Sequence, residues 1–263
     1  MDTLAYIFIF TLIVSVVSLV GGVLLLLKEK FAFRISHYLS AFAAGALLAT
    51  AFFDLIPEAT EHMEELGMEL NIPLWTLIGV LAFFILERFI HHHHSSPRFA
   101  GEAGHGKSIE EKSTVIPLII LGDTMHNFTD GVAIAATFLI SIPLGIVTSL
   151  AVAAHEIPQE IGDFGLMLNR GMKKSKVLMI NFYSSLAAMI GAILTYIYKD
   201  QIVGLLPVVL AITSGFFIYI ALANLIPEIH NRDNQKVAFW ETVMLFMGVL
   251  VVYFAISSLE GAR

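Results

Sequence analysis

Long apolar runs separated by short polar segments make up most of the chain. Most runs reach about 20 residues, the length that an α-helix needs to cross about 30 Å of hydrocarbon. The runs lack the alternation of apolar and polar residues that is typical of membrane β-strands. The pattern therefore predicts an all-α integral membrane protein, built as a bundle of eight transmembrane helices. These helices are expected at residues 4–27, 35–56, 73–90, 115–140, 144–168, 177–198, 203–226 and 237–258.

The overall composition supports this interpretation. Apolar residues make up 57% of the chain and charged residues only 14%, whereas a soluble domain has about 25% charged residues. A soluble globular protein is therefore excluded, and residues 1–263 are expected to form one transmembrane domain. The first apolar run follows Asp2 and has no Lys or Arg before it, so we interpret it as a retained helix and not as a signal peptide.

The basic residues are distributed asymmetrically around the predicted helices. If the helices alternate in direction, 13 of the 15 Lys and Arg residues fall on one side, which leaves Lys199 and Arg263 on the other. Because basic residues mark the cytoplasmic side, both termini are expected outside. The expected outer loop at residues 58–69 carries five Glu and no Lys or Arg, which would attract cations. An ordinary solvated loop explains these glutamates equally well.

Two segments of the chain resemble each other. AAGALLATAFFDLIPEA begins at Ala43 and TSGFFIYIALANLIPEI begins at Thr213, and both end in LIPE after a glycine at the same spacing. The two segments belong to predicted helices of opposite direction, which is typical of the inverted repeats of secondary transporters. We therefore expect a 3+2+3 inverted-repeat arrangement, with chance similarity of two apolar segments as the alternative.

The two central predicted helices contain an unusual number of ionisable residues. Such groups are costly inside a bilayer, so they usually face a bundle interior or an aqueous path and have a function. At about 100° per residue, His126 and Asp130 share one stripe of their helix and Asn127 flanks it. On the next helix one stripe holds His155, Gln159 and Asp163, and the neighbouring stripe holds Glu156 and Glu160.

Imidazole, carboxylate and amide groups together form a ligand set for a divalent transition metal, and the chain has no cysteine for a thiolate site. A buried hydrogen-bond network that merely joins the two helices would explain a single His. Such a network explains less well why these helices contain four acidic residues with no Lys or Arg among them. The four are Asp130, Glu156, Glu160 and Asp163. We expect a divalent metal as substrate, and no cofactor.

The chain resembles a known family, the ZIP (Zrt-, Irt-like protein) divalent metal transporters, and specifically a prokaryotic member. The resemblance covers the whole chain and depends mainly on HNFTDG from His126 and HEIPQEIGD from His155. It implies import toward the cytoplasm, a metal site that often holds two ions, and one group of helices sliding against another. The matching positions are His126, Asn127, Asp130, His155, Glu156 and Gln159.

The chain also departs from the family pattern. Gln159 stands where relatives commonly have His or Glu, so Glu160 is expected to support that part of the site. Asn181 stands where some relatives have a carboxylate, which leaves open whether one or two ions bind. Further secondary, entry or exit positions are expected, and ordinary interfacial polar residues are the alternative for most of them. These positions are Asp54 and Glu58 outside, Asp123 in the fourth helix, and Glu228 and His230 inside.

A cytoplasmic loop is expected at residues 91–113, and it begins with four consecutive histidines. His-rich tracts bind metals, so this loop would bind delivered ions weakly, unless it is a linker without a binding role. The histidines are His91, His92, His93 and His94.

The predicted function is import of divalent metal ions, zinc above all, with iron, manganese and cadmium left open. A passive divalent cation channel is the main alternative. HEIPQ also resembles the HExxH motif of zinc proteases, with Glu156 as general base, but Pro158 and the missing second His argue against an enzyme. We expect a multi-pass protein of the plasma or inner membrane that contacts the lipid bilayer and no nucleic acid. A homodimer is left open.

Overall fold

The computed structural model describes residues 2–92, 109–169, 171–230 and 235–260. These residues form helices and short connections, and no strand occurs among them. Two segments are π-helical (η1 and η3) and one is a 3-10 turn (η2). The elements are α1 (Thr3–Leu27), α2 (Glu29–Thr50), η1 (Ala51–Leu55), α3 (Ile56–Glu65), α4 (Ile72–His92), α5 (Ile109–Ile140), α6 (Ile142–Asn169), α7 (Lys174–Ile197), α8 (Lys199–Ile202), η2 (Val203–Leu205), α9 (Leu206–Tyr219), η3 (Ile220–Leu225), α10 (Ile226–His230) and α11 (Gln235–Glu260).

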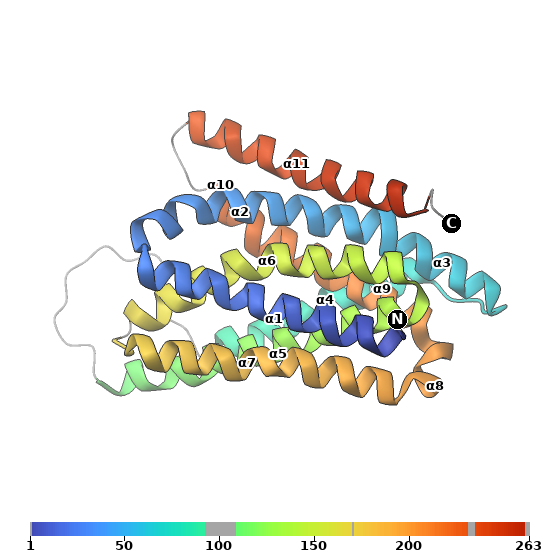
Figure 1. The fold of residues 1–263 in the computed structure, drawn as a ribbon, viewed down its shortest axis with the longest axis horizontal. Coiled ribbons are helices and arrows are strands. Elements are labelled where there is room, and N and C mark those ends of the chain that lie inside the picture. Colours follow the sequence, from blue (N-terminus) through green and yellow to red (C-terminus); the bar gives the residue numbers. More distant parts are fainter. Residues whose placement is uncertain (1, 93–108, 170, 231–234, 261–263) are drawn as a thin grey trace.

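The long helices lie side by side in one elongated bundle (Figure 1). Helix α11 lies against α2 on one edge, and α7 forms the opposite edge. The start of α1 and the end of α11 lie at the same end of the bundle, whereas the α1–α2 and α6–α7 connections lie at the other end (Figure 1). The basic residues of those two connections therefore gather at the end opposite the termini.

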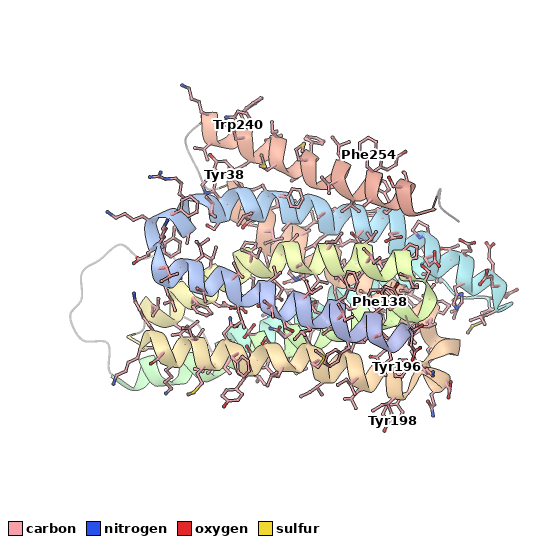
Figure 2. The ribbon with its side chains drawn as sticks, in the orientation of Figure 1. Tyr38, Phe138, Tyr196, Tyr198, Trp240 and Phe254 are labelled. Atoms are coloured by element: carbon pink, nitrogen blue, oxygen red, sulfur yellow. The ribbon has the colours of Figure 1, made fainter. Side chains whose placement is uncertain are left out.

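The outside of the bundle is apolar, as a lipid-facing surface requires. On α11, Trp240 and Phe254 are exposed at the outer edge (Figure 2). Within the described residues, five helical segments are long and apolar enough to cross a membrane. They are Thr3–Leu27, Glu29–Glu65, Lys174–Ile197, Leu206–Leu225 and Lys236–Ser258. Each of the predicted windows overlaps with helical residues, and the number of membrane crossings stays a prediction.

Glycines bring neighbouring helices into backbone contact at four crossings. A side chain at any of these glycines would collide with the backbone of the partner helix, so only hydrogen fits there. In three crossings each helix contributes one glycine. The pairs are Gly45 and Gly248 between α2 and α11, Gly79 and Gly215 between α4 and α9, and Gly131 and Gly191 between α5 and α7, while Gly21 of α1 contacts the Ile157 carbonyl of α6.

Both LIPE sequences begin at the last residue of a π-helical segment. Segment η1 ends at Leu55, before Pro57, and segment η3 ends at Leu225, before Pro227. Proline has no N–H to donate, so the carbonyls of the preceding turn need other partners, and a π-turn is one way to rearrange them. The two similar sequences therefore share a local backbone distortion that their apolar pattern alone did not predict.

Two predicted loops are partly helical. The expected outer loop at residues 58–69 is helix α3 as far as Glu65, followed by a turn at Gly67, which has a φ of 62°. The helix continues because Ala59 and Met63, one turn apart, pack against the apolar core. The expected loop at residues 91–113 begins inside α4 and ends inside α5, and its residues 93–108 lie outside the described part.

Candidate metal site

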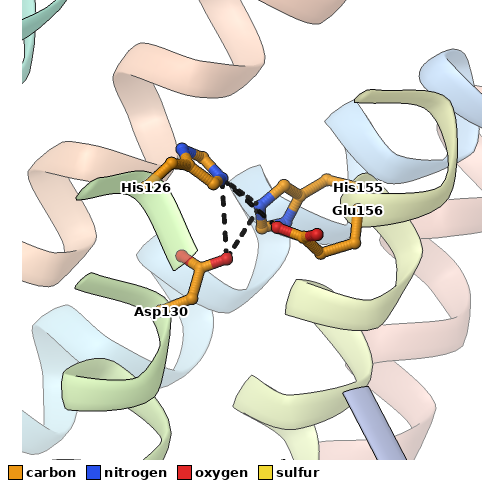
Figure 3. A group of neighbouring side chains, drawn as sticks. All are labelled: His126, Asp130, His155 and Glu156. Atoms are coloured by element: carbon orange, nitrogen blue, oxygen red, sulfur yellow. Dashed lines mark hydrogen bonds and ion pairs between the residues drawn. The ribbon is translucent and has the colours of Figure 1, made fainter. Parts of the chain in front are cut away.

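The site lies between the two central helices, α5 and α6. His126 and Asp130 are four residues apart, so they share one face of α5. His155 and Glu156 are adjacent in α6 and face α5 from the other side (Figure 3). All four side chains are buried, with exposed fractions between 0% and 6%. Two helices thus bring two imidazoles and two carboxylates together in the interior of the bundle.

The ligand atoms of these four residues converge on one point (Figure 3). One atom from each residue lies within 4.8 Å of the other three. The two Nε2 atoms of His126 and His155 are 3.0 Å apart. Asp130 Oδ2 lies 3.3 Å from His155 Nε2 and 3.5 Å from His126 Nε2, and Glu156 Oε1 lies 3.6 Å from His126 Nε2. These distances place four potential ligands around a single small volume.

The hydrogen bonding of this group leaves electron pairs directed at its centre. His155 Nδ1 donates to the Ala151 carbonyl at 3.2 Å, which assigns the proton to Nδ1 and leaves Nε2 with a lone pair. Asp130 Oδ2 and both carboxylate oxygens of Glu156 accept no hydrogen bond from the described residues. No Lys or Arg is among the buried residues that the structure describes. A cation is therefore the partner that this arrangement favours.

The spacing of the four potential ligand atoms matches the coordination shell of a transition metal ion. A zinc ion with four ligands at about 2.1 Å separates neighbouring ligand atoms by about 3.4 Å, which lies within the range of the distances just given. Two nitrogen and two oxygen ligands suit zinc and other borderline divalent ions. The hydrogen bond from His155 Nδ1 to its own helix also fixes the ring, as such bonds do for metal-bound histidines.

Aromatic rings surround the two histidines. The ring of Phe83 on α4 meets His126 edge to face, with centroids 5.7 Å apart, and Phe217 on α9 meets His155 at 6.3 Å. Both phenylalanines are buried. They line this part of the site with apolar surface, which lowers the local dielectric and strengthens charge interactions. In the sequence both residues are simply part of long apolar runs, so the apolar pattern did not indicate this position.

The remaining predicted ligands lie on the same two helices as this group. Asn127 donates from Nδ2 to the carboxylate of Asp123, at 2.9 Å, and to its backbone carbonyl. Glu160 is buried and accepts hydrogen bonds from Ser18 of α1, at 3.0 Å, and from Nδ2 of Asn181. Gln159 is half-buried on α6, and its role as a ligand stays a prediction.

The predicted entry and exit residues are distributed along the bundle. Asp54 is buried in the π-helical segment η1, and Glu58 is half-buried on α3. Glu228 and His230 belong to the short helix α10. His91 and His92 are the last residues of α4, whereas His93 and His94 lie outside the described residues. Sequence reasoning missed Ser18, for which the only signal was a polar residue within an apolar run.

Comparison with known proteins identifies the family. Residues 2–117 and 98–255 match the family described as ZIP Zinc transporter. The chain belongs to the ZIP family. The Zinc transporter ZIP13 of Mus musculus is 30% identical over 263 residues, covering 87% of this chain and 72% of that protein. The Metal cation symporter ZIP8 of Rattus norvegicus is 25% identical over 306 residues, covering 92% of this chain and 66% of that protein.

Family membership decides several of the predictions. This ZIP protein is an all-helical, multi-pass membrane protein and a metal cation transporter, as predicted. ZIP proteins are transporters and not enzymes, so the metalloprotease alternative is wrong. Both of these relatives come from mammals, and the prokaryotic origin of this chain stays a prediction.

Proposed function

We propose that the chain imports divalent transition metal ions into the cytoplasm, with zinc as the preferred ion. The observation that carries this proposal is the buried group of His126, Asp130, His155 and Glu156, whose potential ligand atoms converge on one small volume. The mixture of nitrogen and oxygen ligands binds a borderline cation with lower affinity than thiolates would. Such a site suits an ion that has to be released again.

We also propose that the helices cross the membrane eight times in a 3+2+3 inverted repeat with both termini outside. Three features support this arrangement. The crossing of α2 with α11 and that of α4 with α9 each contain a glycine from both helices. Both LIPE sequences begin at the last residue of a π-helical segment. The basic α1–α2 and α6–α7 connections lie at the end opposite the termini, which agrees with a cytoplasmic position (Figure 1).

Other predictions are proposals that extend this function. Asn127, Gln159 and Glu160 flank the four-residue group, and Asp54 and Glu58 lie near the end that we assign to the outside. Glu228 and His230 lie toward the other end, where they would receive ions that leave the site. A plasma or inner membrane location, a homodimer and weak metal binding by the loop of residues 91–113 stay predictions.

Uptake of radioactive zinc into proteoliposomes tests the function. We expect saturable uptake by the wild type and its loss in His155→Ala, because that variant lacks one of the four ligands. His62→Ala is the matched control, since His62 is paired with Glu65 on α3, away from α5 and α6, and uptake should be unchanged. Absence of zinc uptake by the wild type, or wild-type rates in His155→Ala, contradicts the proposal.

The same vesicles separate a carrier from a passive channel. A carrier gives slow, saturable uptake with a steep temperature dependence, whereas a channel gives single-channel currents in a planar bilayer. Competition of unlabelled iron, manganese and cadmium with labelled zinc ranks the metals. We expect cadmium to compete well, because it shares the preference of zinc for nitrogen ligands, and manganese to compete poorly.

A further inference from the structure

A strongly basic surface lies at the end of the bundle opposite the termini, apart from the candidate metal site. It is formed by the connection between α1 and α2 and by the start of α7 (Figure 1). The described residues 28–34 and 171–176 contain six basic side chains and one acidic side chain, Glu29. All six basic side chains are exposed, and together they are called the basic surface. They are Lys28, Lys30, Arg34, Lys173, Lys174 and Lys176.

Direct contacts hold the two halves of the basic surface together. Lys174 Nζ donates to the backbone carbonyl of Leu26, near the end of α1, at 3.3 Å. The ring of Phe33 on α2 packs against Gly165 of α6, where an added Cβ would come within 3.0 Å of it. Beneath these contacts, one apolar cluster joins α1, α2, α6 and α7. Two connections that are distant in the sequence therefore form one surface on a packed base.

The lysines at the start of α7 stand where helix electrostatics disfavours them. The N-terminal end of a helix carries a partial positive charge, which favours acidic residues and disfavours basic ones. Helix α7 nevertheless has Lys173 at its N-cap, followed by Lys174 and Lys176. Its first turn contains no acidic residue, and the N-cap side chain makes no capping hydrogen bond. Positive charge of the backbone and of three side chains is thus concentrated in one place, and an anion bound there would offset it.

Exposed apolar side chains lie among the basic ones. Leu27, Phe31 and Phe33 have exposed fractions of 77%, 48% and 42%. Leu27 is the last residue of α1, and the two phenylalanines lie between Lys30 and Arg34 in the sequence. An inorganic anion has no use for such neighbours, whereas a phospholipid has acyl chains as well as a charged headgroup. The combination therefore favours a lipid as the anion.

We propose that the basic surface binds the headgroups of anionic phospholipids, and that Leu27, Phe31 and Phe33 contact their acyl chains. The rule that basic residues mark the cytoplasmic side does not require such a site, because it concerns only the side of the membrane on which the charges lie. A lipid bound here would bridge α1, α2 and α7 and stabilise their packing. The proposal goes beyond the proposed function and does not depend on which ion is transported.

Thermal unfolding of the purified protein in a neutral detergent tests this proposal. Phosphatidylglycerol should raise the unfolding midpoint in a saturable way, whereas phosphatidylcholine, whose headgroup has no net charge, should not. Added sodium chloride should weaken the effect, because salt screens exposed charges. Equal stabilisation by phosphatidylcholine, or by inorganic phosphate at the same concentration, overturns the proposal.

Variants without some of the charges locate the binding site. Lys173→Gln/Lys176→Gln removes two charges from the start of α7, and Lys28→Gln/Lys30→Gln removes two from the connection between α1 and α2. Each basic side chain near an anionic lipid contributes about fivefold in affinity. Each double variant should therefore need about 25-fold more phosphatidylglycerol for half of its full effect.

Arg88→Gln/Lys199→Gln is the matched control, because it removes two charges outside the basic surface. Arg88 lies on α4, which packs mainly against α9, and Lys199 begins α8 at the other end of the bundle (Figure 1). This variant should respond to phosphatidylglycerol like the wild type. Each shift is measured against the same variant without lipid, so a change in intrinsic stability does not affect the comparison. An equally weakened response in the control, or wild-type responses in both surface variants, overturns the proposal.

Discussion

The contact between α1 and α6 leaves no room for a side chain at Gly21. In Gly21→Ala, the new Cβ would lie 2.6 Å from the Ile157 carbonyl oxygen. An ordinary contact needs about 3.4 Å, so α1 has to retreat by about 0.8 Å. Ser18 is three residues away on the same face of α1. Its hydrogen bond to Glu160 would lengthen from 3.0 Å to about 3.8 Å, which breaks it.

Two effects then lower the stability of the variant. Overpacking at such a contact costs about 1–3 kcal/mol, and loss of a hydrogen bond to a buried carboxylate costs about 1.5–3 kcal/mol. Because the helix shift relieves part of the first cost, we expect a total of about 2–4 kcal/mol. Thermal unfolding in detergent, followed by far-ultraviolet circular dichroism, should show a midpoint about 5–10 °C lower than that of the wild type.

Gly162→Ala is the control for this experiment. Gly162 lies on α6, and a Cβ there would meet nothing within 4 Å. Alanine favours a helix over glycine by about 1 kcal/mol, so this variant should be as stable as the wild type or more stable. If Gly21→Ala unfolds at the same temperature as Gly162→Ala, the close backbone contact of α1 with α6 does not stabilise the protein.

Two further predictions concern proton competition and the proposed repeat. The affinity of the four-residue group for cadmium, measured by equilibrium dialysis of the purified protein, should fall steadily between about pH 8 and about pH 5. The reason is that protons and metal compete for the same imidazole and carboxylate atoms. A pH-independent dissociation constant in dialysis contradicts that ligand set. Gly45→Ala and Gly215→Ala should lower the unfolding midpoint by similar amounts, because each new Cβ meets a backbone carbonyl of the partner helix. Destabilisation by only one of them argues against equivalent crossings.

The length and continuity of the apolar runs were sufficient to predict the helices. Their ends were harder to predict, because an apolar run stops where the hydrocarbon stops, and a helix can continue into the polar region. Residues 58–65 illustrate this: five glutamates at residues 58–69 suggested a loop, but Ala59 and Met63 keep one face of α3 packed on the core. The π-helical segments depend on how backbone carbonyls near a proline find partners, which the apolar pattern does not encode.

The central part of the candidate site followed from spacing along single helices. His126 and Asp130 share a face because they are one turn apart, and His155 lies next to Glu156 in the chain. Spacing did not indicate which neighbouring helix each face meets. Glu160 points to α1 and α7 because the glycine contact of α1 with α6 brings Ser18 close. That placement depends on tertiary packing, so Ser18 could not be found from the sequence.

The hydrogen bond from His155 Nδ1 to the Ala151 carbonyl has a consequence for assembly. Both groups belong to α6, so the imidazole is oriented as soon as this helix forms, without help from its neighbours. His126 and Asp130 are likewise brought together within α5 alone. Membrane helices can form first and pack afterwards. Each helix therefore carries two potential ligands that are already oriented. Separation of α5 from α6 at any stage would divide the candidate metal site into two intact pairs instead of distorting it.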